Sequence, residues 1–277
     1  MHLIGGFYMN WMKKKTKTII KFVLWKWWKL IYISSWRKNK EQILRELMEY
    51  TNLSRNEISI NVEHGAELVA DEWNKLNPQT LEEIIKAYQE LENYIYDLSN
   101  YDYFNIPEFI YRERIAKKSR RSKRFLDYGA GIGDICLRVK QINNNVDVTY
   151  YDLKGKTMDF AKWRFKKRRM NINIIEASDN EDMLQNKYDT IICFDILEHV
   201  MDPEKHLKRI QKHLEHNGQL FIKAPFEKSQ THSMHIDSEK TLVEYLTSLN
   251  FKKKGRSDRL VFPRRWTLSN NSKLEEK

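Results

Sequence analysis

The 277-residue chain has only two cysteines, Cys136 and Cys193, and both fall in apolar stretches. Two cysteines cannot build the framework of several disulfides that stabilises small secreted domains, so that class of fold is excluded. Their apolar neighbours predict two small buried side chains rather than metal ligands or redox groups. Few cysteines and no disulfide framework suit a reducing compartment, and we expect a cytoplasmic protein.

Acidic residues are absent from the first 40 positions, which hold ten lysines and arginines. These ten charges account for nearly all of the formal net charge of +11, so the rest of the chain is close to neutral. A strongly basic surface is the usual signature of a nucleic-acid-binding domain. The near-neutral body therefore makes RNA the less favoured partner, and we expect no nucleic-acid partner.

An apolar and aromatic run over residues 18–36 is interrupted by Lys21, Lys26 and Lys29. The run is long enough to span a bilayer, but a lysine near the centre of a span costs about 2.5–3.5 kcal/mol. No small-residue cleavage site follows it, which speaks against a secretory signal. Three interpretations stay open for residues 13–40: packing on this protein or on a second subunit, peripheral contact with an anionic membrane surface, and a true span.

The stretch Asp127-Tyr128-Gly129-Ala130-Gly131-Ile132-Gly133 places glycine at every second position after a short apolar strand, 124–128. Glycine tolerates positive φ and has no Cβ, so a ligand can lie against such a backbone. The N–H groups of the turn and of the following helix favour a negatively charged group. No Gly-Lys-Ser/Thr follows, which excludes a P-loop. Alone, the motif fits either a structural turn or a nucleotide-binding turn.

Polar residues also follow the next three predicted strands. The second strand ends in Asp152, about 20 residues beyond the glycine turn, where an acid can bind both hydroxyls of a ribose. The third strand, 173–176, leads into Ser178 and Asp179, and the fourth, 188–194, leads into Asp195. Strands that alternate with helices indicate a mostly parallel sheet with ligands at its carboxyl edge.

With these four motifs in this order and spacing, the stretch from about Arg124 to Leu268 resembles the class I S-adenosylmethionine-dependent methyltransferases. The resemblance implies an α/β fold, with a Rossmann-like, mostly parallel sheet flanked by helices, and S-adenosyl-L-methionine as cofactor. It places the glycine turn under the amino acid end of the cofactor, Asp152 at the ribose, and Ser178 and Asp179 at the adenine. The cofactor residues that it implies are Asp127, Gly129, Ala130, Gly131, Gly133, Asp152, Leu153, Ser178, Asp179 and Asp195.

The basic residues of the predicted helix 157–169, among them Arg164 and Arg168, are most simply a solvated face near a helix C-terminus. A phosphate-binding role is the alternative. For the whole chain we expect three parts: a basic aromatic arm over 1–40, a helical lid subdomain over 41–120, and the methyltransferase domain over 121–277.

In the lid part, Thr80-x-x-Glu83 fits a capping box and predicts a long helix that begins near Thr80. Helices ahead of the first strand often form a lid over cofactor and acceptor in the family that the chain resembles. By that resemblance, Tyr94 and Tyr103 line the acceptor pocket. The alternative for each is ordinary core packing, since tyrosines on helices are usually structural.

Three histidines are candidate bases for an acceptor that must lose a proton, because histidine titrates near neutrality. They are His199, in the loop after the fourth strand, and His232 and His235, after the fifth. By resemblance, the segment 225–237 contacts substrate, so His235 is also a candidate acceptor contact. A structural role is the alternative for each.

The turn Asp195-x-x-Glu198-His199 resembles the metal-binding Glu-x-x-Glu-His turn of the ubiquinone-pathway O-methyltransferases. Two carboxylates and an imidazole there would hold Mg²⁺ or Zn²⁺ beside a phenolic oxygen. Aspartate replaces the first glutamate of the motif in this chain. We therefore expect no metal.

These patterns together favour an enzyme that transfers a methyl group in line to a small-molecule acceptor, at oxygen or nitrogen, with carbon as a further candidate. Two alternatives share the same cofactor motifs: transfer or cyclisation of the aminocarboxypropyl group, and a non-catalytic cofactor-binding scaffold. RNA methylation is a weaker alternative, because it requires salt-sensitive RNA affinity. The patterns are specific to the superfamily and select no acceptor.

Overall fold

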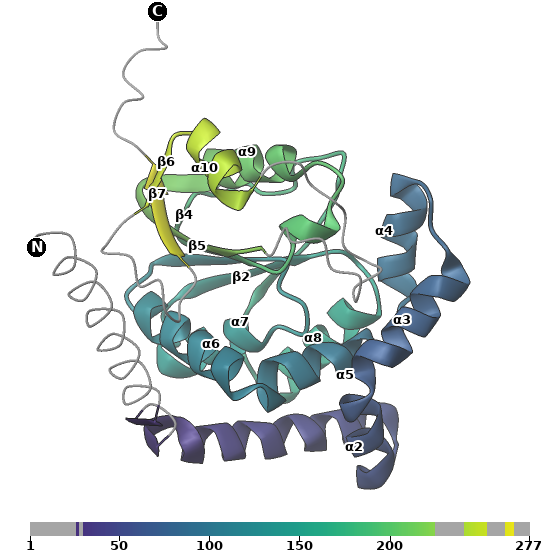
Figure 1. Ribbon diagram of the computed structural model, residues 1–277. Helices are drawn as coiled ribbons and strands as arrows, with labels where there is room; N and C mark the ends of the chain where they lie inside the picture. Colours follow the sequence, from purple (N-terminus) through teal and green to yellow (C-terminus); the bar gives the residue numbers. More distant parts are fainter. Residues whose placement is uncertain (1–25, 28–29, 225–240, 254–263, 269–277) are drawn as a thin grey trace, which may run out of the picture.

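The computed structural model describes residues 26–27, 30–224, 241–253 and 264–268. Within them the sheet has seven strands in the order β3-β2-β1-β4-β5-β7-β6 (Figure 1). β7 runs antiparallel to both of its neighbours, and the pairs from β3 to β5 are parallel. The strands are β1 (Arg124–Tyr128), β2 (Asp147–Asp152), β3 (Asn173–Glu176), β4 (Tyr188–Phe194), β5 (Leu214–Lys223), β6 (Phe251–Lys253) and β7 (Arg264–Leu268). The expected mostly parallel α/β sheet is confirmed.

Helices cover both faces of the sheet (Figure 1). Strand side chains alternate between the faces, so Phe125 packs in the core against α7 and α8 while Leu126 packs in the core under α9. Cys136 and Cys193 are buried and unpaired, as expected for small hydrophobic residues. The helices on the two faces are α6 (Ile106–Ser119), α7 (Asp134–Ile142), α8 (Lys156–Lys167), α9 (Pro203–His213) and α10 (Leu242–Ser248).

A set of helices precedes the sheet, as the sequence predicts. One helix runs without a break over residues 30–51, so the boundary that we placed at residue 40 falls inside it. It passes beneath the domain and leads to the helices that we call the lid helices, α3, α4 and α5 (Figure 1). The elements after it are α2 (Arg55–Glu63), α3 (Gly65–Leu76), α4 (Leu81–Glu90), α5 (Tyr94–Ser99) and a π-helical turn (Asn100–Phe104).

The helix predicted from Thr80 begins as expected but is shorter than expected. Thr80 and Glu83 form the capping box. The helix ends at Glu90 because Leu91 leaves helical geometry, with φ −56° and ψ 109°. Leu91 is buried, and Glu72 of α3 binds the backbone N–H and side-chain amide of Asn93. Packing against α3 therefore breaks the chain into α4 and α5.

Arg164 corrects the interpretation of the basic face on α8. Its side chain has no exposed surface, and it joins three separate parts of the molecule. Nε donates to Glu46 of the N-terminal helix at 2.9 Å, Nη2 donates to the Tyr103 hydroxyl at 2.6 Å, and Nη1 donates to the carbonyl of Ile132 in the glycine turn. Arg168 donates two further bonds to Glu46, at 2.6 and 2.8 Å. Burial opposes ionisation, yet Arg164 and Arg168 lower the pKa of Glu46.

The apolar run over 18–36 is only partly described, since residues 18–25 and 28–29 lie outside the described ranges. In the described part of the chain, no helix combines the length and the apolar character that a bilayer span needs. Trp36, at the end of the run, donates from Nε1 to the carbonyl of Tyr103 at 2.7 Å. This end of the run thus packs on the protein itself.

We expect Arg164→Met to lower the free energy of unfolding by about 3–5 kcal/mol, because it removes one of the two cations that bind the buried Glu46 carboxylate and leaves the buried carbonyl of Ile132 without its arginine donor. Urea unfolding followed by circular dichroism measures this loss. Arg55→Met is the matched control. It breaks a second Arg–Glu pair that involves the N-terminal helix, between Glu41 of that helix and Arg55 of α2, and this pair lies at the surface. That pair should contribute less than about 1 kcal/mol. Equal losses for the two variants would contradict the role assigned to Arg164.

Candidate functional site

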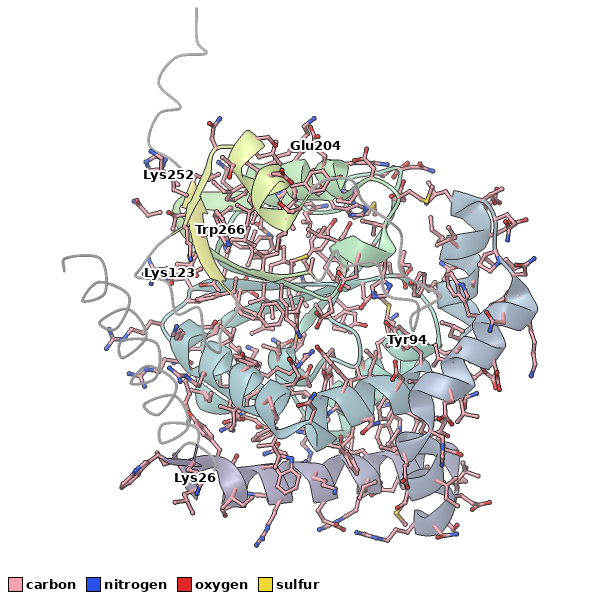
Figure 2. The ribbon with its side chains drawn as sticks, in the orientation of Figure 1. Lys26, Tyr94, Lys123, Glu204, Lys252 and Trp266 are labelled. Carbon is pink, nitrogen blue, oxygen red and sulfur yellow. The ribbon has the colours of Figure 1, made fainter. Side chains whose placement is uncertain are left out.

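A cleft of about 360 Å³ lies at the carboxyl edge of β1, β2 and β4 and reaches the lid helices. The strand order reverses between β1 and β4, and such a reversal leaves a crevice where ligands bind. A second hollow, of about 710 Å³, lies at the amino edge of the strands and is lined by Lys123. It contains none of the predicted motif residues. Figure 2 shows Tyr94 on the side of the cleft and Lys123 at the opposite end of the sheet.

The glycine turn takes the conformation that its sequence predicts. Gly129, Gly131 and Gly133 all have positive φ, of 76°, 52° and 72°. A Cβ on Gly129 would lie 2.1 Å from Cδ1 of Ile196, and one on Gly133 would lie 2.4 Å from the ring of Phe165. Positive φ favours glycine at both positions, and a larger residue would also have to displace the side chain of Ile196 or Phe165. The turn leads directly into α7, with Gly133 as its N-cap.

Asp152 links the end of β2 to the glycine turn. Its Oδ2 accepts a hydrogen bond from the N–H of Gly131 at 2.5 Å, and its Oδ1 accepts one from the N–H of Leu153 at 2.7 Å. Burial raises its pKa to about 6, and the two backbone donors oppose that rise. Each carboxylate oxygen keeps a further lone pair, so the group can still accept hydrogen bonds from a ligand in the cleft.

The loop after Asp152 also touches the lid. A Cβ on Gly155 would lie 2.5 Å from the carbonyl oxygen of Gln89 in α4. The backbones of the two segments therefore approach as closely as glycine allows. The lid helix is seated directly on the loop that carries the acid of β2.

Asp127 is buried behind the glycine turn, where its Oδ2 accepts a hydrogen bond from the thiol of Cys136 at 3.3 Å. Burial, and next the nearby Asp134, raise its pKa to about 8. Asp134 pairs with Arg112 of α6 at 3.0 Å, and Arg112 also pairs with Asp102 at 2.7 Å. Arg112 is thus a cation of the cleft that our sequence analysis missed.

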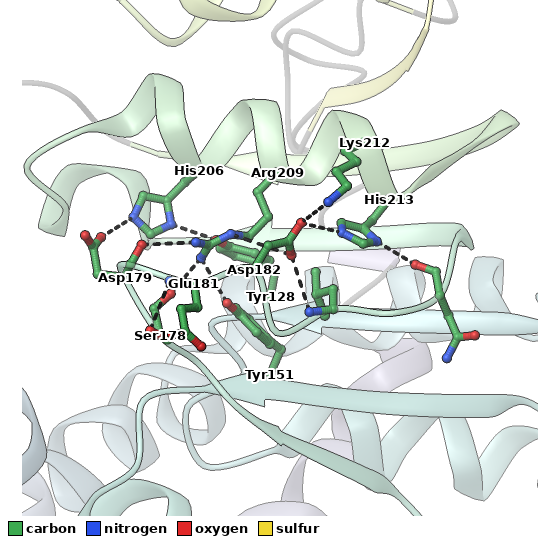
Figure 3. Close-up of polar contacts among 12 residues, drawn as sticks. Tyr128, Tyr151, Ser178, Asp179, Glu181, Asp182, His206, Arg209, Lys212 and His213 are labelled. Carbon is green, nitrogen blue, oxygen red and sulfur yellow. Dashed lines mark hydrogen bonds and ion pairs between the residues drawn. The ribbon is translucent and has the colours of Figure 1, made fainter.

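The loop after β3 carries Ser178 and Asp179 and is fixed by side chains of α9 (Figure 3). Arg209 donates to the carbonyl oxygens of Ser178 and Asp179, at 2.9 and 3.1 Å, and to the hydroxyl of Tyr151 at 3.0 Å. Lys205 donates to the carboxylate of Asp179 at 2.7 Å. The basic spacing i, i+4 on this helix is the only sequence signal that we can identify for these contacts.

His206 of α9 lies buried in the same group of contacts. It shares a hydrogen bond of 2.7 Å with the hydroxyl of Tyr128, between Nδ1 and the oxygen. Burial, and next Arg209, lower its pKa to about 4. His206 is therefore neutral at physiological pH and serves as a fixed polar group beside the loop.

Asp195 begins the loop after β4 in left-handed backbone geometry, with φ 55°. Its Oδ2 pairs with Nζ of Lys223 at 3.1 Å. The same ammonium group donates to Glu108 at 2.9 Å and to the hydroxyl of Tyr101. Lys223 thus binds Asp195, Glu108 and Tyr101, which lie on three different segments. Our sequence analysis did not identify this group of contacts around Asp195.

His199 lines the cleft beside the lid. Its Nδ1 shares a hydrogen bond of 2.9 Å with the hydroxyl of Tyr88 in α4, and Tyr94 lies against the other side of Tyr88. Glu198 is buried, and among the described residues its Oε2 meets no hydrogen-bond donor. Burial, and next the nearby Asp195, raise the pKa of Glu198 to about 8.

The structure brings nearly all predicted site residues to one cleft. The lining residues among them are Asp127, Gly129, Ala130, Gly131, Asp152, Leu153, Ser178, Asp179, Asp195, Tyr94 and His199. Gly133 lies in the turn but packs under Phe165. His232 and His235 lie outside the described residues.

Tyr103 does not line the cleft, in contrast to our expectation. The π-helical turn directs its side chain toward α8, where its hydroxyl binds Arg164. Tyr101 of the same turn lines the cleft instead. The candidate metal-binding turn, Asp195 to His199, lies within the described ranges. Over those ranges, no group of three His, Cys, Asp or Glu side chains is placed to hold a metal ion.

The reversed strand order, the glycine turn and the acid at the end of β2 define a Rossmann-like nucleotide-binding domain. Comparison with known families gives the particular class: residues 106–255 match the family described as Methyltransferase domain, Methyltransf_23, over more than half of the chain. The chain belongs to this family, within the class I S-adenosylmethionine-dependent methyltransferases.

Curated relatives match part of the chain. A ubiquinone biosynthesis O-methyltransferase of Coxiella burnetii is 30% identical over 104 residues, 37% of this chain and 43% of that protein. An (S)-coclaurine N-methyltransferase of Thalictrum flavum is 27% identical over 139 residues, 50% of this chain and 38% of that protein. The chain thus spans less than half the length of these relatives.

Among solved structures, an O-methyltransferase family protein from Burkholderia thailandensis superposes with a TM-score of 0.49. It is 13% identical, and the match covers 76% of this chain and 72% of that one.

Glu198 predicts a pH dependence of stability. Its pKa is about 8 in the fold but about 4.3 when unfolded. The folded state therefore holds a proton that the unfolded chain releases, so this contribution is present below about pH 4 and is lost as pH rises to about 8. Buried Asp127, with a raised pKa, contributes in the same direction.

We expect Glu198→Gln to flatten part of the fall in melting temperature between about pH 5 and about pH 8.5. Thermal melts in a pH series measure it. Glu181→Gln, which changes an exposed glutamate in the loop after β3, is the control and should leave the profile unchanged. A Glu198→Gln profile that runs parallel to that of the parent would show that Glu198 is already ionised at neutral pH.

Proposed function

We propose that the protein is a methyltransferase that transfers a methyl group from S-adenosyl-L-methionine to the oxygen or nitrogen of a small-molecule acceptor, with carbon as a further candidate. The observation that carries the proposal is the position of Asp152, bonded to the glycine turn at one side of a cleft that has Asp195 and His199 at the other. The family supports methyl transfer. The relatives include both an O-methyltransferase and an N-methyltransferase.

The residues of the cleft fit this cofactor. Asp152 has lone pairs left for a ribose diol, and Asp127 is a buried acid close to the turn that would face an ammonium group. The fixed Ser178–Asp179 loop offers polar groups to an adenine. An acidic lining also suits a ligand that carries positive charge on sulfur and nitrogen.

S-adenosyl-L-methionine supplies an electrophilic methyl group on a sulfonium when it is bound. The chain's own contribution is to hold the acceptor in line and to exclude water. His199 is the proposed base, because its imidazole lines the cleft and Tyr88 fixes its orientation. Base catalysis of this kind contributes about 100- to 10,000-fold to a rate. Tyr94 and Tyr101 are the proposed aromatic contacts of the acceptor.

Asp152→Asn should raise the dissociation constant for S-adenosyl-L-methionine about 10- to 100-fold, because it removes the charge from a buried hydrogen-bonding group. Isothermal titration calorimetry measures the constant. Asp147→Asn is the matched control: Asp147 is the first residue of the same strand, is exposed, and lies at the far edge of the sheet. Equal affinities for the two variants would exclude Asp152 from the cofactor site.

Product analysis tests the reaction itself. The protein is incubated with S-adenosyl-L-methionine and a panel of phenols, catechols and amines, and the nucleoside product is identified by mass spectrometry. We expect S-adenosylhomocysteine. Methylthioadenosine would indicate aminocarboxypropyl transfer, and binding without any product from the panel would support a scaffold; either result contradicts methyl transfer to these acceptors.

With an acceptor in hand, His199→Asn should lower kcat about 100- to 10,000-fold and leave cofactor affinity unchanged. The control is His64→Asn, which changes an exposed histidine ahead of α3. A His199→Asn variant with the kcat of the control would assign the base to another residue.

A further inference from the structure

The lid side of the cleft is apolar. α4 turns Leu81, Ile84, Ile85 and Tyr88 toward the cleft, and their spacing of i, i+3, i+4 and i+7 forms one helical face. α3 adds Ala66, Val69 and Ala70 from the facing helix. None of the lining residues that α3 and α4 contribute carries a charge.

This apolar face is incompletely covered in the described part of the chain. Leu81 is 38% exposed, and Ile84, Ile85 and Ala70 are half-buried. Val69, Trp73, Ala87 and Leu91 form a buried cluster between the two helices, and Ile84 and Tyr88 of the open face pack against this cluster on one side. Covering apolar surface contributes roughly 25 cal/mol per Å². A ligand that covers this face gains that energy.

The open face is continuous with the proposed reaction site. Tyr88 is its last member and shares a hydrogen bond with His199, the proposed base. From there the same cleft runs past Asp195 to the glycine turn and Asp152. The polar end therefore suits the cofactor, and the apolar end begins where the acceptor must lie.

We propose that the acceptor is amphipathic, with its nucleophilic head group at His199 and an apolar chain between α3 and α4. This inference rests on the proposed function, and it names the acceptor class. Ala66 and Ala70, whose side chains are small, line the same cleft as Ile85. A sugar or phosphate group in that position would lose hydration and meet no charged or amide side chain among the α3 and α4 lining residues.

Two other occupants are physically conceivable and serve as outcomes of the test. One is the chain's own segment 225–240, which is largely polar and offers Phe226, Met234 and Ile236 as its larger apolar residues. The other is a second copy of the protein. Both would cover the face without any small molecule.

The test uses phenol, para-butylphenol and para-octylphenol as probes, with the full chain saturated by S-adenosylhomocysteine. Calorimetry gives a dissociation constant for each. We expect the dissociation constant to fall about fourfold for every methylene that is buried on the face, since a buried methylene is worth about 0.8 kcal/mol. The affinity for S-adenosylhomocysteine is measured separately, so failure of the cofactor site and failure of the acceptor inference give different results.

Two variants test the location of the chain. Ile85→Ser should reduce the gain from phenol to para-octylphenol, because it places a hydroxyl on the apolar face. Ala70→Phe should make the gain level off at a shorter chain, because it fills the space. Ile60→Ser is the matched control, since Ile60 lies on α2, is 49% exposed and lies outside the cleft. Thermal melts confirm that each variant folds.

Dissociation constants that do not change with chain length, together with normal binding of S-adenosylhomocysteine, would overturn the inference and leave the proposed function standing. If a gain with chain length appears only after Phe226, Met234 and Ile236 are replaced by serine, the chain's own segment occupies the face. A dimer by size-exclusion chromatography that Ile85→Ser dissociates would assign the face to a second copy. Either result overturns the proposal.

Discussion

A single buried guanidinium holds the site to the rest of the molecule. Arg164 has no contact with solvent, yet it donates to the N-terminal helix, to the π-helical turn and to the backbone of the glycine turn. A buried charge is stable only when its hydrogen-bonding groups are paired, so these three segments are required together. Arg164 thus connects the backbone of the glycine turn to Glu46, which lies on the N-terminal helix, before the lid helices in the sequence.

The arrangement above this support follows from the sheet. Strand order reverses between β1 and β4, and the motif residues of the cleft lie at the carboxyl end of a strand or in the loop that follows it. Several carboxyl groups lie close together there. Burial, and next the nearby carboxylates, raise the pKa values of Asp127 and Glu198 to about 8. Arg112 forms an ion pair with Asp134, and Lys223 forms one with Asp195, so these two carboxylates are each paired with a positive charge. The cleft therefore has less negative charge than a count of its carboxyl groups suggests.

The sequence analysis predicted the features that depend on residues close together along the chain. The strands 124–128, 173–176 and 188–194, the glycine turn, the capping box at Thr80 and the position of Asp152 all follow from local patterns, and the structure has them. The contacts of Arg164 with Glu46 and of Lys223 with Tyr101 join residues more than a hundred positions apart, and no local pattern encodes them. For that reason the sequence analysis placed Arg164 on a solvated basic face and predicted Tyr103 as a contact of the acceptor. The break between α4 and α5 depends on a shorter-range tertiary contact, between Asn93 and Glu72 of α3, which the helical pattern of the segment does not encode.

The close approach of Gly155 to Gln89 has a thermodynamic consequence. Because the two backbones are in contact, α4 cannot move toward the loop that follows Asp152 without displacing that loop. A molecule that settles one of these segments changes the free energy of the other, and linkage makes that influence equal in both directions. If ligands bind at the nucleotide end and beside α4, each then changes the affinity for the other by the same factor.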